Sequence, residues 1–415
     1  MAKTKNNKKI QKDNEITIPP IVESKRDSKK KKKEKKPNWF KRHKKTTIVL
    51  CFFITLLFAA SAAFIIAKLN KPEETITKSS KPAAIHYYSA LSGREVDSKD
   101  EIHAATTCVM IENSTAARPQ SGLEDAGVVY EAIAEGGISR FLTIFQDRKP
   151  NLVGPVRSVR LHFAQWGTPY HCTFAHVGGA DDALQLVRSS NDIRDADQFF
   201  NDSYYWRSKN RHAPHNMYTS FEKLDQFNQS KNYTSSQFEG FARKTSKIKK
   251  VQKQLKKCAE LQKKATQDST QSSKVNEKCT NLASVININL SSSVFNPNYQ
   301  YNSQDNTYYR SYQNGEKHLT VNKEGQESQL HPDVVIAIAV GAVNRPGTEY
   351  DNFVTTGEGK AHIFQNGTVK EATWVRQSAN DELSFKDAKG KTIKLNRGQT
   401  WITAYPANVG NVQYQ

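Results

Sequence analysis

Apolar residues between positions 91 and 242 recur at two spacings, one typical of strands and one typical of helices. Short runs such as TTCVMIE, VVYEAIAE and ISRFLTIFQ indicate strands, whereas VRSVRLHFAQWG and ADDALQLVRSS carry apolar residues at helical intervals. Strand-like and helix-like segments that alternate in this way predict an α/β or α+β domain over residues 91–242.

The pattern changes from residue 284 onward, where aromatic and β-branched residues alternate with polar ones. The pairs Asn314-Gly315 and Asn366-Gly367 interrupt these runs, and such pairs are a strong short-range signal for a β-hairpin. We therefore predict a second domain over residues 284–415 that is mostly antiparallel β.

Residues 243–283 lie between these domains and read as a Lys-rich helical hairpin. The run KIKKVQKQLKKCAELQKK has one apolar helical stripe, and a polar turn and a shorter helix follow it. An antiparallel hairpin would bring Cys258 opposite Cys279, and closing such a loop with a disulfide is worth roughly 3 kcal/mol in the chain-entropy model. Cys108 and Cys172 lie in strand-like runs, and the sequence leaves open whether they are free or paired.

The N-terminal part of the chain predicts a membrane anchor. Residues 46–67 contain no charged residue, and at about 1.5 Å per residue they can cross a hydrocarbon core of about 30 Å. The basic and disordered residues 1–45 precede this span, which places the N-terminus in the cytoplasm. A linker over residues 68–90 then leads to an extracytoplasmic body, so we expect a single-pass protein of the cell membrane.

The net charge of +20 would suggest a nucleic-acid binder if the charge were spread over the body of the protein. Residues 1–45 hold 18 Lys and Arg against 5 acidic residues, and residues 243–278 hold 12 against 3. The rest of the chain therefore has a net charge of −2. Because no recognition motif accompanies either basic segment, we expect no specific nucleic-acid partner.

The first group of candidate functional residues places charges among apolar residues. Alternation in VVYEAIAE puts Glu131 and Glu135 on one strand face, and Arg140, Arg157 and Arg160 follow in the next segments. Charges are rarely buried without a partner. These residues therefore form an internal ion-pair network, bind an anionic ligand through their guanidinium groups, or supply general acid and base groups.

The second candidate group is the segment AHVGGADDA. His176 ends a strand, and Gly178 and Gly179 would allow a ligand to approach the backbone near a helix N-terminus, a frequent anion site. Asp181 and Asp182 oppose an anion there, because carboxylates cap the helix themselves. No metal-ligand spacing accompanies the histidine, and we expect neither a metal nor a cofactor.

The third candidate group is the loop KNRHAPHNMY, which presents Arg211, His212, His215, Asn216 and Tyr218. His215 is a general acid or base by residue type, although a loop histidine is more often a hydrogen-bonded structural residue. The chain has no serine-nucleophile signature of the G-x-S-x-G or S-x-x-K kind.

Five segments of the first domain together resemble the YerB-type bacterial envelope proteins, a family of unknown function numbered DUF3048. They are RPQSGL, VVYEAIAEGGISRF, GPVRSVR, HVGG and RHAPHNMY, and the C-terminal runs GEGKAHIFQNGTVKEATWVR and LNRGQTWITAYP resemble the second domain of that family. The resemblance implies a two-part surface protein, usually anchored as a lipoprotein. Leu50 before Cys51 makes a poor lipoprotein signal here, and the Lys-rich hairpin is an addition to the family pattern.

The resemblance implies no reaction, but its motifs coincide with the polar groups described above. It thus predicts one shared pocket formed by Arg140, Arg157, Arg160, His176, Arg211, His215 and Asn216. The favoured function is a membrane-anchored envelope protein that binds an anionic cell-wall-related ligand or an envelope partner. One alternative is a cell-wall glycopolymer hydrolase or transferase that uses Glu131 or Glu135 with His215, and a second is a non-catalytic scaffold that acts through the basic hairpin.

Overall fold

The structure, a computed structural model, describes residues 44–69, 85–267, 279, 281–344 and 348–415. The chain divides into two compact units, Met1–Ala83 and Ala84–Gln415. In the first unit, helix α1 (Lys44–Leu69) covers the predicted anchor and exposes apolar side chains such as Phe52 and Phe58. Taken over the described residues, no helix reaches the combination of length and apolar character that a bilayer span requires.

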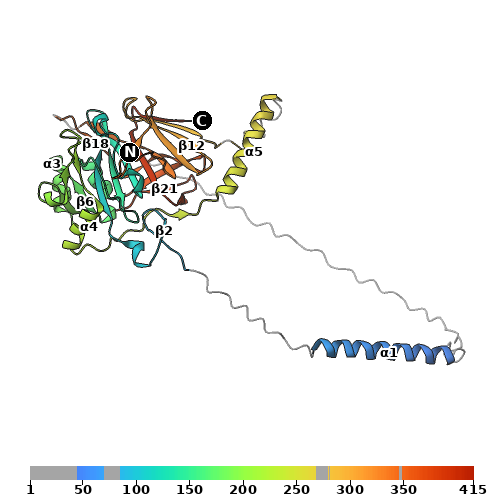
Figure 1. The fold of residues 1–415 in the computed structure, drawn as a ribbon. Helices are drawn as coiled ribbons and strands as arrows, with labels where there is room; N and C mark the ends of the chain where they lie inside the picture. Colours follow the sequence, from blue (N-terminus) through green and yellow to red (C-terminus); the bar gives the residue numbers. More distant parts are fainter. Residues whose placement is uncertain (1–43, 70–84, 268–278, 280, 345–347) are drawn as a thin grey trace, which may run out of the picture. The chain divides into compact units, whose positions relative to one another are not determined.

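The second unit is organised around a ten-stranded mixed sheet (Figure 1). In spatial order its strands are β21 (Ser384–Lys386), β20 (Thr368–Arg376), β19 (Gly357–Gln365), β16 (Val334–Val340), β23 (Thr400–Pro406), β4 (Val128–Glu135), β5 (Ile138–Phe145), β3 (Thr107–Glu112), β6 (Thr173–His176) and β7 (Arg194–Asp197). The runs VVYEAIAE and ISRFLTIF form β4 and β5, and both are almost completely buried, as their apolar composition predicts.

Parallel pairing of β4 with β23 joins the two predicted domains into this one sheet. Val128 lies opposite Thr400 and Glu131 lies opposite Thr403, so strands from the two ends of the unit meet at the centre of the sheet. The predicted boundary between residues 242 and 284 therefore does not separate two independent cores.

A second, four-stranded antiparallel sheet and five strand pairs complete the β structure. The sheet has the order β13 (Thr307–Tyr312), β12 (Pro297–Asn302), β11 (Val285–Asn289) and β24 (Asn411–Tyr414). The pairs are β1 (Tyr87–Tyr88) with β2 (Glu95–Val96), β8 (Trp206–Arg207) with β9 (Met217–Tyr218), β10 (Arg243–Lys244) with β22 (Leu395–Asn396), β14 (Leu319–Val321) with β15 (Glu327–Gln329), and β17 (Ala342–Asn344) with β18 (Asp351–Phe353). Antiparallel pairing dominates the C-terminal part, in agreement with its hairpin signals.

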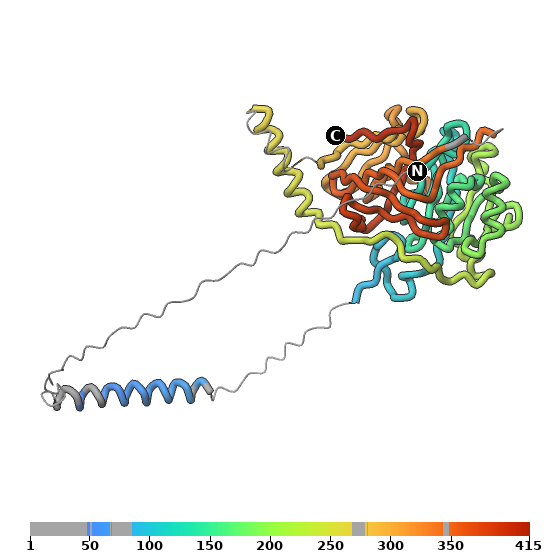
Figure 2. The backbone as a smooth tube through the Cα atoms, turned by 180° about the vertical axis from the view of Figure 1, so that it is seen from behind, coloured from blue at the N-terminus to red at the C-terminus, as the bar shows by residue number. Residues whose placement is uncertain are grey.

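Helices α2 (Leu161–Gly167), α3 (Asp181–Ser189) and α4 (Phe221–Ser230) pack beside the β3–β7 half of the sheet, shown in green in Figures 1 and 2. Ser220 caps α4, because its side chain accepts the backbone N–H of Lys223. Short 3-10 turns lie at Asp100–His103, Thr115–Ala117, Leu123–Asp125, Thr168–Tyr170 and Asp202–Tyr204.

Helix α5 (Ile248–Gln267) is the first arm of the predicted Lys-rich hairpin. A disulfide joins Cys258 on this helix to Cys279, which is the pairing that the sequence suggested. Most of the predicted second arm lies outside the described residues. A second disulfide joins Cys108 on β3 to Cys172, the residue before β6. The sequence left open whether these two cysteines are paired, and the structure pairs them.

A buried ion pair between Glu131 on β4 and Arg310 on β13 connects the two sheets. Both side chains are fully buried, and Arg310 Nη2 lies 2.8 Å from Glu131 Oε1. Trp401 and Thr403 donate to the other carboxylate oxygen, at 3.2 and 3.1 Å. Burial disfavours the charge on Arg310, but Glu131 together with Tyr299 and Tyr312 outweighs this effect, so the pKa of Arg310 lies above its ordinary value.

The other two nitrogen atoms of the Arg310 guanidinium also have hydrogen-bond partners. Nη1 donates to the hydroxyl oxygen of Tyr299 at 2.6 Å, and Nε donates to Nδ1 of His318 at 2.7 Å. Burial and the charge of Arg310 hold the pKa of His318 well below its usual range, so His318 stays neutral and accepts this bond. Each nitrogen of the Arg310 guanidinium and each oxygen of the Glu131 carboxylate thus has a hydrogen-bond partner. A buried ion pair is tolerated when its polar atoms are paired in this way.

We expect Arg310→Met to lower the free energy of unfolding by about 3–5 kcal/mol, because it leaves the Glu131 carboxylate buried without its counter-charge. Urea unfolding of the chain, followed by circular dichroism, measures this change. The matched control is Lys360→Met, which breaks an exposed pair with Glu371 at 3.9 Å and should change stability little. Equal losses in the two variants would contradict the central role of the buried pair.

Candidate functional site

Charged side chains gather at the edge of the sheet where β3 and β4 end. Glu112 and Glu135 are the last residues of these strands, and Arg140 on β5 lies opposite Glu112. The strand pairing shifts between Ile133 and Glu135, which takes Glu135 out of the regular alternation that includes Glu131. We name this group the carboxyl-edge cluster; its members are Glu112, Glu135, Arg140, Arg157, Arg160 and His215.

Glu135 binds two arginines of the cluster. Its Oε1 accepts from Arg140 at 2.7 Å, and its other oxygen pairs with Arg160. Burial alone would raise the pKa of the Glu135 carboxyl, but the two guanidinium groups outweigh burial and lower it. Burial also lowers the pKa of Arg140 to about 10, and its Nη1 donates to the carbonyl oxygen of Ser158.

Glu112 forms the other half of the cluster. Its Oε1 lies 2.9 Å from His215 Nδ1 and accepts from the Ser114 hydroxyl at 2.9 Å, while Oε2 lies 3.3 Å from Arg157 Nε. The sequence reasoning missed Glu112, although it ends the apolar run TTCVMIE and carries the same signal as Glu131 and Glu135. A carboxylate at the end of a buried strand was the sign that would have identified it.

The carboxylates proposed for a hydrolase are engaged in these internal contacts. Glu131 is fully buried against Arg310, and Glu135 is paired with two arginines. His215 contacts Glu112 and neither of the two candidate carboxylates. This arrangement counts against Glu131 or Glu135 acting with His215 as an acid–base pair, because none of these groups faces the other across an open cleft.

The AHVGGADDA segment is held by its own contacts. His176 is fully buried, with Nδ1 2.8 Å from the carbonyl oxygen of Gly178 and Nε2 2.9 Å from Asp195 Oδ1. The backbone N–H of Gly178 donates to Asp197. At Gly179 an added Cβ would lie 2.5 Å from Val159, so this glycine serves close packing of two segments. Among the described residues, no group of three or more His, Cys, Asp or Glu side chains is arranged to hold a metal ion.

The third candidate loop is also tied down by hydrogen bonds. Arg211 donates to the backbone carbonyl oxygens of Ala116, Arg118 and Pro119. Asn216 is buried and bonds to Arg207, Ser208 and Arg211, whereas His212 is exposed.

The structure distributes the side chains of the predicted site residues over three sets of contacts. It brings together Glu135, Arg140, Arg157, Arg160 and His215 at the carboxyl-edge cluster. His176, Gly178 and Gly179 contact β7, and their backbone also runs beside that of Arg157 and Val159. Arg211 and Tyr218 lie at a third place, where both line a groove. Sequence motifs could identify each set of polar residues, but they could not show which residues from other parts of the chain lie around it.

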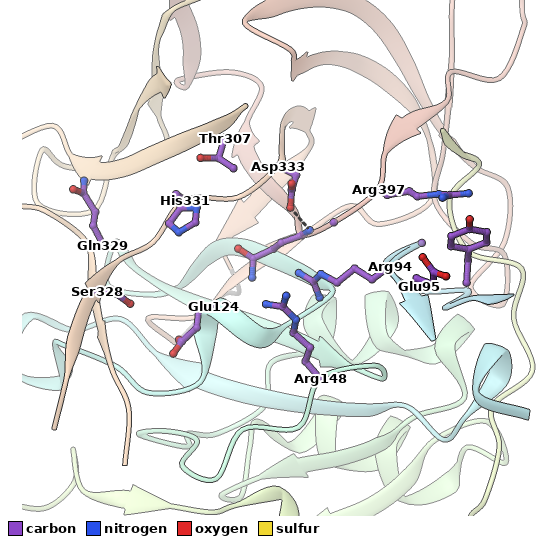
Figure 3. Close-up of a pocket in the computed structure, with 14 residues that line it drawn as sticks. Arg94, Glu95, Glu124, Arg148, Thr307, Ser328, Gln329, His331, Asp333 and Arg397 are labelled. Atoms are coloured by element: carbon purple, nitrogen blue, oxygen red, sulfur yellow. Dashed lines mark hydrogen bonds between the residues drawn. The ribbon is translucent and has the colours of Figure 1, made fainter. Parts of the chain in front are cut away.

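A cavity of about 550 Å³ lies at the opposite edge of the sheet, before the first residues of β4, β16 and β23 (Figure 3). Its wall includes three arginines, Arg94, Arg148 and Arg397, and three carboxyl groups, Glu95, Glu124 and Asp333. In Figure 3 the guanidinium groups of Arg94 and Arg148 point into the same part of the cavity. A volume of this size is typical of small-molecule sites.

The arginines of the cavity are only partly engaged by carboxylates. Arg94 Nη1 lies 3.2 Å from Asp147, but Arg148 approaches Asp125 only to 3.8 Å and its side chain is 53% exposed. The guanidinium of Arg397 lies over the ring of Tyr88, 3.4 Å from its centre, in a cation–π contact. The cavity thus offers guanidinium donors to a ligand, in contrast to the carboxyl-edge cluster.

Two of the three carboxyl groups, Glu124 and Asp333, each accept a hydrogen bond at one oxygen, and Glu95 pairs with His86. Thr320 donates to Glu124 Oε2 at 2.5 Å, and the backbone N–H of Gln399 donates to Asp333 Oδ2 at 2.8 Å. Burial raises the pKa of both groups. Gly398 has φ +117°, and a Cβ there would lie 2.0 Å from Asp333 Oδ2, so only glycine admits this carboxyl so close to the backbone.

Residues 91–234 match the N-terminal domain, and residues 286–402 the C-terminal domain, of a family described as Protein of unknown function (DUF3048). The chain belongs to this family. It is 28% identical over 298 residues to YerB of Bacillus subtilis (strain 168), a protein whose name calls it a lipoprotein, and the match covers 72% of this chain and 80% of that one. The crystal structure of YerB superposes with a TM-score of 0.61 at 24% identity, covering 79% of this chain and 99% of YerB. The predicted family resemblance is confirmed.

Both family domains contribute to the wall of the cavity. Arg94, Glu124 and Arg148 belong to the first matched segment, whereas Asp333 and Arg397 belong to the second. The sequence analysis named none of these residues as candidates. They lie in short polar segments next to strands, and LNRGQTWITAYP, which includes Arg397 to Gln399, was noticed only as a family motif.

We expect the stabilising effect of Glu135 to depend on pH in a defined direction. Its folded-state pKa lies below that of an unfolded glutamate, so its contribution is complete above a pH of about 4.3 and is lost as the pH falls through the lowered pKa. Glu135→Gln should cost roughly 1–3 kcal/mol at neutral pH, and less as the medium becomes acidic. Urea unfolding across this range, with the exposed Glu358→Gln as control, checks the prediction. A cost that grows on acidification would contradict it.

Proposed function

We propose that this protein is a membrane-anchored envelope protein whose second unit binds an anionic ligand in the cavity of Figure 3. The observation that carries the proposal is the convergence of Arg94 and Arg148 on one open volume. Two like charges repel each other, and an anion between them relieves that repulsion. Guanidinium groups also bind carboxylates and phosphates through paired hydrogen bonds, which gives such a site direction as well as charge.

Glu124 and Asp333 narrow the kind of ligand that the cavity accepts. A simple anion gains nothing from these carboxyl groups or from Glu95, which also lines the cavity, whereas a ligand that also carries hydroxyl or amide N–H groups donates to them. The mixed lining therefore favours an anionic molecule with several hydrogen-bond donors. Carbohydrates that carry a carboxylate or phosphate have this composition, and they are components of the bacterial cell wall.

The location at the envelope is supported by the relative that is named as a lipoprotein and by the charge pattern of the N-terminal residues. We propose that residues 46–67 form a single-pass anchor, that residues 1–45 remain cytoplasmic, and that the second unit is extracytoplasmic. Two disulfides in that unit support this side of the membrane, because structural disulfides persist in oxidising compartments.

Isothermal titration of the detergent-solubilised chain with purified wall-teichoic-acid and peptidoglycan fragments tests the binding. We expect Arg148→Ala to weaken the binding about tenfold or more, because it removes a charge-assisted hydrogen bond of roughly 1.5–3 kcal/mol. Lys360→Ala removes a similarly exposed cation that is not in the cavity lining, and it should leave the affinity unchanged. The proposal fails if neither class of fragment binds, or if both variants bind as the wild type does.

A further inference from the structure

A second depression, a groove of about 420 Å³, lies beside the cavity. We name it the Trp206 groove; the lining residues used here are Leu152, Trp206, Arg211, Tyr218, Asn322 and Lys323. Its walls come from the β8–β9 pair and from the turn between β14 and β15. Arg211 and Tyr218 were both expected at a ligand site from the sequence.

An aromatic surface forms one side of the groove. The ring of Trp206 is partly exposed and stacks on that of Tyr218, with centres 6.5 Å apart and an interplanar angle of 27°. Tyr218 is buried and pairs with Trp206 across the strands, so it holds the indole in place. A fixed, partly exposed indole offers a flat apolar face, and the apolar faces of sugar rings pack on such a surface.

Positive charge and amide groups surround this aromatic face. Arg211 is oriented by three backbone carbonyl oxygens, which are neutral acceptors, and Lys323 is exposed on the opposite wall. Asn322 is held in its turn by accepting the backbone N–H groups of Glu324 and Gln326. Among the described residues that line the groove, none is acidic. The groove therefore suits a sugar that carries an anionic group.

Three chain segments run directly from the groove to the cavity. Ser121, Leu152 and Val321 line the groove, and Glu124, Arg148 and Gln329 in the same three segments line the cavity. In addition, Thr320, the neighbour of Val321, donates to Glu124. The two depressions therefore adjoin, with the β14–β15 hairpin as a shared wall.

We propose that the Trp206 groove and the cavity are adjacent subsites for one anionic glycan of several sugar units. One sugar stacks on Trp206 with its anionic group toward Arg211 and Lys323, and the next anionic unit lies against Arg94 and Arg148. This inference rests on the function proposed for the cavity. It adds the ligand class, a charged oligosaccharide, and a dependence on chain length.

Titration with oligosaccharides of alternating N-acetylglucosamine and N-acetylmuramic acid, from disaccharide to octasaccharide, tests the inference on the full chain in detergent. Each muramic acid unit carries a carboxylate, and uncharged chitin oligosaccharides of equal length serve as the charge control. We expect the wild-type affinity to rise about tenfold or more once the oligosaccharide is long enough to reach both subsites.

The variants separate the two subsites. Trp206→Ala and, independently, Lys323→Ala in an exposed turn should remove the gain in affinity with chain length, whereas Arg148→Ala should weaken the binding of oligosaccharides of every length. Trp206→Phe should restore part of the gain, and Phe200→Ala, an exposed aromatic side chain outside both depressions, should have no effect.

Binding that depends on Arg148 but not on length, on Trp206 or on Lys323 overturns the shared-ligand inference and leaves the cavity function intact. Equal binding of chitin oligosaccharides overturns the requirement for an anion. Absence of binding at every length overturns the inference together with the proposed carbohydrate ligand of the cavity, and teichoic-acid binding then decides whether the cavity function itself survives.

Discussion

The ion pair between Glu131 and Arg310 is the contact on which the architecture of the second unit depends. It joins a strand of the first family domain to a strand of the second, inside a core where neither side chain reaches solvent. A buried charge without its partner costs several kcal/mol, so separation of the two domains would leave one unpaired charge in each domain. Together with the β4–β23 pairing, this makes the two domains one folded body rather than two modules on a linker.

Both candidate binding depressions follow from that union. The cavity takes Arg94 and Arg148 from the first family domain and Asp333 and Arg397 from the second, and the groove likewise combines Arg211 with Lys323. Neither domain alone encloses these volumes. The ligand recognition that we propose for these places therefore depends on residues of both domains, which gives a physical reason for the two domains to occur in one chain.

Local patterns in the sequence predicted the local structure well. The apolar run at residues 128–135 is β4, the polar turn at Asn366-Gly367 joins β19 to β20, and Cys258 meets Cys279. Period and turn chemistry act over a few residues, so they carry no information on strand order. The partner of Glu131 lies 179 residues away along the chain, and the cavity residues occupy short segments without any period. The charges in the strands thus showed that partners exist, but only the fold shows which ones.

The carboxyl-edge cluster contains more of the sequence motifs than the cavity at the opposite end of the strands. The state of its charged groups explains why it is nevertheless the weaker candidate for a ligand site. At the carboxyl edge, Glu135 engages two arginines and Glu112 engages Arg157 and His215, so most of the charge is matched within the protein. At the other edge, Arg148 lies 3.8 Å from the Asp125 carboxylate, interacts at longer range with Glu124, and lines the cavity. A guanidinium already bonded to a buried carboxylate must break that bond to bind a ligand, whereas a solvated one exchanges only water. The proposed ligand site therefore rests on the open arginines rather than on the most numerous ones.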